Sequence, residues 1–193
     1  KFMKNFYFDF EMISDDKKTI DFIDTLKDYE ATIDTNTSTP IANIFISSVG
    51  GENRMAAVVY HFFTTSTFKY NFIVHGSFSS NTILILLALN PEFITIMRQA
   101  NTIVHLSNYN YPIGTIALNK YSNASMNEFN DFKEYLKSTL KLYKTFLSED
   151  EISIIKQGGD VSLGAKRVAK LFKKLKKNQK IQNKAKKLFE ITL

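Results

Sequence analysis

The chain has 193 residues, no cysteine and a formal net charge of +6. This length suffices to bury the core of a single domain. The absence of cysteine excludes disulfide scaffolds, thiol catalysis and Cys-ligated zinc, and the longest strongly apolar run, Thr82 to Leu89, is too short to cross a bilayer. No signal peptide is visible, so we expect a cytoplasmic protein.

Hydrophobic periodicity divides residues 6–105 into alternating strands and helices. Strands are predicted at 6–10, 44–46, 72–74, 93–97 and 102–105, helices at 15–29, 52–63 and 83–89, and a polar loop at 30–40. In the first helix, Ile20, Ile23 and Leu26 recur at helical spacing and should face the core. The alternation predicts an α/β fold of right-handed βαβ units around a largely parallel sheet.

A long helix is predicted from Ser125 to Leu147. Ser125 and Glu128 have the spacing of a capping box, and apolar residues form a stripe along the helix: Phe129, Phe132, Leu136, Leu140, Tyr143 and Leu147. Two interpretations remain open. The helix packs on the sheet, or it projects from the body and mediates self-association.

The C-terminal segment carries most of the positive charge. Residues 166–193 contain 11 Lys or Arg and one acid, for +10, whereas residues 1–165 contain 14 basic and 18 acidic residues, for −4. The pattern from Ala165 to Leu188 is helical, with Val168, Leu171, Phe172 and Leu175 on one side and lysines elsewhere. We therefore expect a body at 1–165 and a basic helical tail at 166–193. A solvated helix face is favoured over nucleic-acid or membrane binding, because aromatic residues do not interleave with the lysines.

Three polar residues follow predicted strands or glycine turns and form a candidate catalytic set. Ser80 lies between a strand and an apolar helix, His105 ends an apolar run, and Asp160 follows Gly158-Gly159. A hydroxyl, an imidazole and a carboxylate are the groups that acyl transfer requires. Each residue also has a purely structural interpretation: Ser80 and Asp160 as helix N-caps and His105 as a satisfied strand-end residue.

Neighbouring residues compete for two of these roles. Ser77 and Ser79 are alternative hydroxyls, and His75, which directly precedes Gly76, is an alternative base. We favour Ser80 and His105, because a histidine on the strand of the nucleophile is poorly placed to face it.

Four patterns, in order, resemble the Clp protease proteolytic subunit over residues 44 to about 171. The strand followed by Gly50-Gly51 resembles that family's strand and N-S-P-G-G turn. The run 76–82, Gly-Ser-Phe-Ser-Ser-Asn-Thr, resembles its nucleophile motif G-x-A-A-S-M-G. His105 follows an apolar strand 25 residues after Ser80, and 160–168 resembles the motif opened by the family's acid.

This resemblance implies a crotonase-like fold and a serine endopeptidase with the triad Ser80, His105 and Asp160. It places the oxyanion hole at the backbone N–H groups of Gly50 and Asn81 and implies substrate contacts at Gly51, Tyr111 and Gly114. It also implies a homo-oligomeric, chambered enzyme that acts on peptides or unfolded proteins, with an ATP-dependent unfoldase as a possible separate partner. Hydrolysis by a triad needs no cofactor, and no metal or nucleotide motif is expected.

The chain departs from the family patterns at Val49, Phe78, Thr82, Leu106 and Val168. None of these changes removes a catalytic atom. Phe78 and Thr82 replace smaller residues and are expected to crowd Ser80. They motivate the alternative function, a catalytically inactive Clp-like ring or scaffold subunit.

Overall fold

The structure, a computed structural model, describes residues 3–9, 15–33, 39–106 and 123–191, with backbone only for 123–130. Four strands form a parallel sheet in the order β1-β2-β3-β4. Their bounds are Lys4–Phe8, Ala42–Ser48, Tyr70–Phe78 and Ile94–Ile96. The predicted α/β class with a parallel sheet is thus confirmed.

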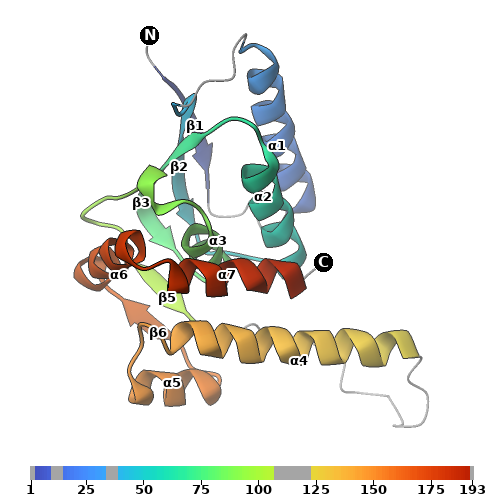
Figure 1. The fold of residues 1–193 in the computed structure, drawn as a ribbon, viewed down its shortest axis with the longest axis vertical. Coiled ribbons are helices and arrows are strands. Elements are labelled where there is room, and N and C mark those ends of the chain that lie inside the picture. Colours follow the sequence, from blue (N-terminus) through green and yellow to red (C-terminus); the bar gives the residue numbers. More distant parts are fainter. Residues whose placement is uncertain (1–2, 10–14, 34–38, 107–122, 192–193) are drawn as a thin grey trace.

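Helices cover one face of this sheet. They are α1 (Asp16–Ala31), α2 (Asn53–Thr65) and α3 (Asn81–Ala88), and a 3₁₀ turn, η2 (Pro91–Phe93), precedes β4. Figure 1 shows α1 and α2 side by side beyond the strands. Every residue of α3 is buried, which explains why its sequence is apolar all round. The prediction for α1 was partly wrong: Ile20 is 48% exposed, and Thr19, Phe22, Ile23 and Leu26 form the buried side.

The fifth strand does not join the parallel sheet, contrary to the simple βαβ expectation. β5 (Thr102–Val104) pairs antiparallel with β6 (Val161–Leu163). The chain entering β5 runs beside the end of β3, where Phe78 N donates to Asn101 O and Ser80 N donates to Ile103 O, both at 3.0 Å. β5 therefore connects the turn at Ser80 with the segment that carries Asp160.

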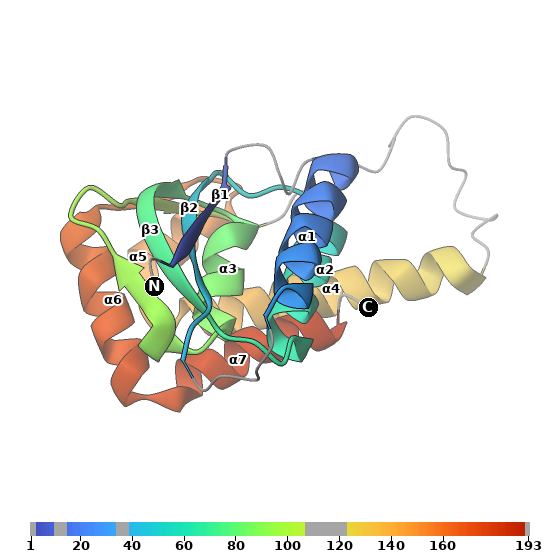
Figure 2. The same cartoon turned by 90° about the horizontal axis from the view of Figure 1, so that it is seen from above.

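The long helix α4 (Asn123–Tyr143) begins two residues before Ser125 and ends before Leu147. The predicted capping box therefore does not mark its start. Figure 2 shows the N-terminal end of α4 reaching past the other helices. One side of the second half is buried, with Tyr135, Leu142 and Tyr143 in the core. The packing interpretation therefore holds for the second half of α4, and the first half projects; self-association through it stays a prediction.

The basic segment forms two helices, α6 (Ala165–Lys177) and α7 (Gln179–Ile191), instead of the one helix predicted over 165–188. The break is at Asn178, whose side chain accepts a hydrogen bond from Lys180 N at 3.0 Å. The apolar sides of both helices join the core, and Phe189 stacks on Tyr60 with ring centroids 4.3 Å apart. The net charge of the chain changes at the predicted boundary, residue 165. The hydrophobic core nevertheless includes residues on both sides of it.

One further helix, α5 (Glu149–Lys156), lies between α4 and β6 and was not predicted. None of the helices in the described ranges is long and apolar enough to span a membrane.

Candidate active site

Ser80 occupies a strained turn between β3 and α3. Its backbone has φ 53° and ψ −125°, and it is the only non-glycine residue with positive φ in the described parts of the chain. Such a conformation costs on the order of 1–3 kcal/mol and is tolerated where the surroundings enforce it. Here the backbone bond from Ser80 to Ile103 on β5 contributes to that enforcement. A sharp strand-to-helix turn exposes a serine hydroxyl at the end of a strand.

The three predicted side chains form one hydrogen-bonded chain. His105 Nε2 lies 2.9 Å from Ser80 Oγ, and His105 Nδ1 lies 3.1 Å from Asp160 Oδ1. With the proton on Nδ1, His105 Nε2 accepts a hydrogen bond from the Ser80 hydroxyl, and Nδ1–H donates one to the Asp160 carboxylate. The predicted proximity, with Asp160 on the far side of the ring from Ser80, is confirmed. The catalytic roles stay a prediction.

The capping interpretations of Ser80 and Asp160 are contradicted. Ser80 is at the N-cap position of α3, yet its side chain makes no capping hydrogen bond and contacts His105 instead. Asp160 precedes strand β6, and α6 begins five residues later, at Ala165, with Gly164 as its N-cap. Neither side chain is therefore used to begin a helix.

The competing residues have other contacts. Ser79 Oγ accepts the backbone N–H of Ile103 at 3.0 Å, and Ser77 Oγ lies 3.3 Å from Ser79 Oγ. His75 lies on β3 with its ring against Phe45, 6.0 Å between centroids. Among these candidates, only Ser80 pairs with His105 in the described structure.

The expected crowding of Ser80 by Phe78 and Thr82 is not observed. Phe78 is fully buried and its ring meets Phe172 of α6 edge-on at 6.1 Å. Thr82 is also buried and lines a small internal cavity with Phe8 and Ile44 of the sheet. Both side chains belong to the core, and Ser80 itself is only partly buried.

The predicted oxyanion residues Gly50 and Asn81 lie next to Ser80. A Cβ on Gly50 would come within 2.7 Å of Ser80 Cβ and 3.0 Å of Asn81 N, and Gly50 has φ 95°. Only glycine permits this approach and conformation. Gly50 N–H donates to Ser48 Oγ at 3.3 Å, a long bond that a developing oxyanion would have to displace or share. Asn81 is the first residue of α3, so its N–H has no acceptor within the helix.

The site is open to solvent on its acidic side. The His105 side chain is 38% exposed and the Asp160 side chain 65% exposed. Because both side chains are exposed to water, the Asp160–His105 hydrogen bond orients the ring more than it stabilises the fold.

Sequence reasoning missed three supporting side chains. Tyr143 OH donates to the backbone carbonyl of His105 at 3.1 Å, Thr102 Oγ1 donates to the carbonyl of Phe78, and Tyr135 OH donates to Asn81 Oδ1 at 3.2 Å. The two tyrosines are eight residues apart, two helical turns, on the buried side of α4. Their spacing predicts a common face but not its partners, which are remote in sequence.

Of the predicted substrate contacts, only Gly51 is described. It follows Gly50 in the loop before α2, and its carbonyl accepts a hydrogen bond from Asn81 Nδ2 at 2.5 Å. Tyr111 and Gly114 lie outside the described residues.

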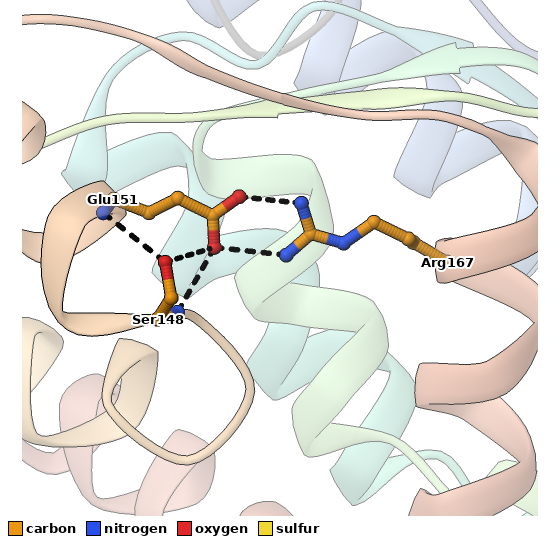
Figure 3. Close-up of polar contacts among 3 residues, drawn as sticks. All are labelled: Ser148, Glu151 and Arg167. Carbon is orange, nitrogen blue, oxygen red and sulfur yellow. Dashed lines mark hydrogen bonds and ion pairs between the residues drawn. The ribbon is translucent and has the colours of Figure 1, made fainter.

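A second polar cluster lies away from the triad. Glu151 of α5 forms an ion pair with Arg167 of α6, through both carboxylate oxygens, and also bonds to Ser148 (Figure 3). Ser148 and Glu151 form a capping box at the start of α5. The hydrogen bond from Arg167 lowers the pKa of Glu151 from 4.5 to about 2. These contacts join two helices, which is a structural role.

No family model matches the chain, and no curated protein matches it. In the described ranges, no group of three or more His, Cys, Asp or Glu is arranged to hold a metal ion.

Proposed function

We propose that the protein is a serine peptidase of the Clp-like, crotonase-fold kind. The observation that carries the proposal is the chain of hydrogen bonds from Ser80 through His105 to Asp160, which starts at a strained strand-to-helix turn. Glycine at position 50, within contact distance of the serine, supports it further.

In the proposed mechanism, Ser80 Oγ attacks the peptide carbonyl carbon as His105 Nε2 takes the hydroxyl proton. The N–H groups of Gly50 and Asn81 stabilise the negative oxygen of the tetrahedral intermediate. His105 then protonates the leaving amine, and the C–N bond breaks to leave an acyl-Ser80 ester. A water molecule, deprotonated by the same imidazole, hydrolyses this ester and restores Ser80. Asp160 keeps the proton on Nδ1 and stabilises the imidazolium.

The inactive-subunit alternative depended on crowding by Phe78 and Thr82. Both side chains are buried in the core, and no specific observation favours this alternative.

We further propose that the chain is a subunit of a cytoplasmic homo-oligomer. The predicted association through the whole α4 stripe is not available, because Tyr143 and Leu147 are buried in the chain's own core. Two other features support association: the projecting end of α4 (Figure 2) and the outer face of the parallel sheet, where Tyr7, 62% exposed, stacks on Phe45.

The test of the peptidase proposal is labelling by a fluorophosphonate probe together with hydrolysis of fluorogenic peptides. Both should occur with the natural sequence and be lost in Ser80→Ala. Ser77→Ala is the matched control, since it removes a nearby hydroxyl that does not contact His105, and it should keep both. Absence of labelling in the natural sequence, or equal hydrolysis by Ser80→Ala, would refute the proposal.

A further inference from the structure

The side chain of Asn81 joins three elements around the candidate nucleophile. It is buried, with 2% of the residue exposed. Its Nδ2 donates to the carbonyl of Gly51 at 2.5 Å and to Asn53 Oδ1 at 2.9 Å. Its Oδ1 accepts the hydroxyl of Tyr135 at 3.2 Å. Both amide hydrogens and one acceptor position are therefore used.

These partners determine which way the amide points. Two acceptors face Nδ2, and one donor faces Oδ1, so the reversed orientation would oppose oxygen to oxygen. Tyr135 thus holds the amide with its N–H groups toward the Gly50-Gly51 loop. A buried amide with all these bonds made is rigid, since each bond lost would leave an unsatisfied group.

The bond to Gly51 joins the two segments that carry the proposed oxyanion-hole donors. One donor of that hole, Gly50 N–H, is on the loop, and the other, Asn81 N–H, is on α3. The Asn81 amide ties the loop carbonyl directly to the first residue of α3. Backbone donors stabilise an oxyanion only when both lie about 3 Å from the same point, so their relative position has to be maintained.

We propose that the Asn81 side chain is a positioning residue that sets the geometry of the oxyanion hole, and that Tyr135 acts through it. This inference rests on the proposed peptidase function. Any substitution other than proline keeps the Asn81 backbone N–H, so the side-chain role is separable from the backbone role.

The test is steady-state hydrolysis of a fluorogenic peptide by Asn81→Ala, Tyr135→Phe and the double variant, well below their unfolding temperatures. For Asn81→Ala we expect kcat to fall about 10- to 100-fold, less than the loss of a donor itself, with KM changed less than about threefold. Tyr135→Phe should lower kcat by about three- to tenfold. In the Asn81→Ala background, the Tyr135→Phe change should have no further effect, because Tyr135 acts through Asn81.

Two readouts separate positioning from general structure. The pH profile of kcat/KM should be unchanged in the variants, since the Ser80–His105–Asp160 bonds do not involve the amide. Affinity for a peptide boronate, which places an oxygen in the oxyanion hole, should fall in parallel with kcat. Asn43→Ala is the matched control: it removes a half-buried amide that donates to Asn5 Oδ1 at 2.9 Å on β1, and it should leave kcat unchanged.

A folded Asn81→Ala protein with kcat within twofold of the natural sequence would overturn the inference and leave the peptidase proposal standing. If Asn81→Ala fails to fold, unchanged kcat in Tyr135→Phe overturns it instead. A natural sequence that hydrolyses no peptide would overturn the peptidase proposal and this inference together.

Discussion

Gly50 shows most directly how one residue shapes the candidate site. Its φ of 95° and its separation from Ser80 both exclude a side chain. In Gly50→Ala the new methyl group would displace Ser80 or the loop, so we expect kcat to fall by at least about 100-fold, as for the loss of an oxyanion donor. Stability should fall by about 1–3 kcal/mol. Peptide hydrolysis and urea unfolding measure the two effects.

Gly158→Ala is the control for that substitution. Gly158 also has positive φ, 83°, but a Cβ there would meet nothing within 4 Å. In this variant the free energy of unfolding should fall only by the cost of alanine at positive φ, roughly 1 kcal/mol. Its kcat should stay within about threefold of that of the natural sequence. If both variants have equal activity, the contact between Gly50 and Ser80 does not matter for catalysis.

At the scale of elements, the Glu151–Arg167 ion pair joins α5 to α6 and predicts a pH dependence of stability. The pKa of Glu151 is lowered from 4.5 to about 2. The contribution of ionised Glu151 to the stability of the fold is therefore complete above about pH 4.5. It is lost as the pH falls from 4.5 toward 2. Because Arg167 is partly exposed, we expect at most about 1 kcal/mol.

Thermal unfolding between pH 6 and pH 2.5 tests this. At pH 6, Arg167→Ala should have a lower Tm than the natural sequence. At pH 2.5, the difference in Tm between the two proteins should be smaller. Arg54→Ala removes an exposed bond to Asp16 and should change the Tm little at either pH. A constant difference between Arg167→Ala and the natural sequence across this range would contradict the prediction.

Prediction from sequence succeeded where a pattern is local. The periodic strands and helices of residues 4–88 were found because each repeats its own spacing. The proximity of Ser80, His105 and Asp160 was predicted from the four patterns that resemble the Clp family, together with the strand or glycine turn that precedes each residue. It failed where the tertiary environment decides. β5 left the main sheet to pair with β6, 57 or more residues later in the chain, and Ile20 faces solvent because Phe22 and Thr19 occupy the buried side of α1.

The polar supports of the site could not be predicted for a related reason. Asn81 and Tyr135 are 54 residues apart, and nothing local to either residue indicates the other. The basic segment illustrates the same limit: its lysines suggested a separate tail, whereas Leu188 and Phe189 complete the core against α2 and α3.

For the whole molecule, the open outer face of the parallel sheet predicts self-association. Parallel sheets are usually covered on both faces, whereas Tyr7 is largely exposed here and Phe45 is half-buried. Light scattering at micromolar concentration should give a mass above that of one chain, and Tyr7→Lys should lower it. Ile20→Lys, which alters an exposed apolar residue on α1, should not. A strictly monomeric natural sequence would contradict the oligomer proposal but not the peptidase proposal.

The strained turn at Ser80 has a consequence for the stability of the fold. Glycine adopts a φ of 53° without penalty, so Ser80→Gly should unfold at a higher temperature than Ser80→Ala, by an amount equivalent to about 1 kcal/mol. Both variants lack the hydroxyl, so the difference measures the relief of strain minus the extra conformational entropy of glycine in the unfolded chain. A lineage with no need of that hydroxyl could gain stability by one substitution. Serine at this position therefore lowers the stability of the fold, a cost that the proposed nucleophilic role of the hydroxyl would account for.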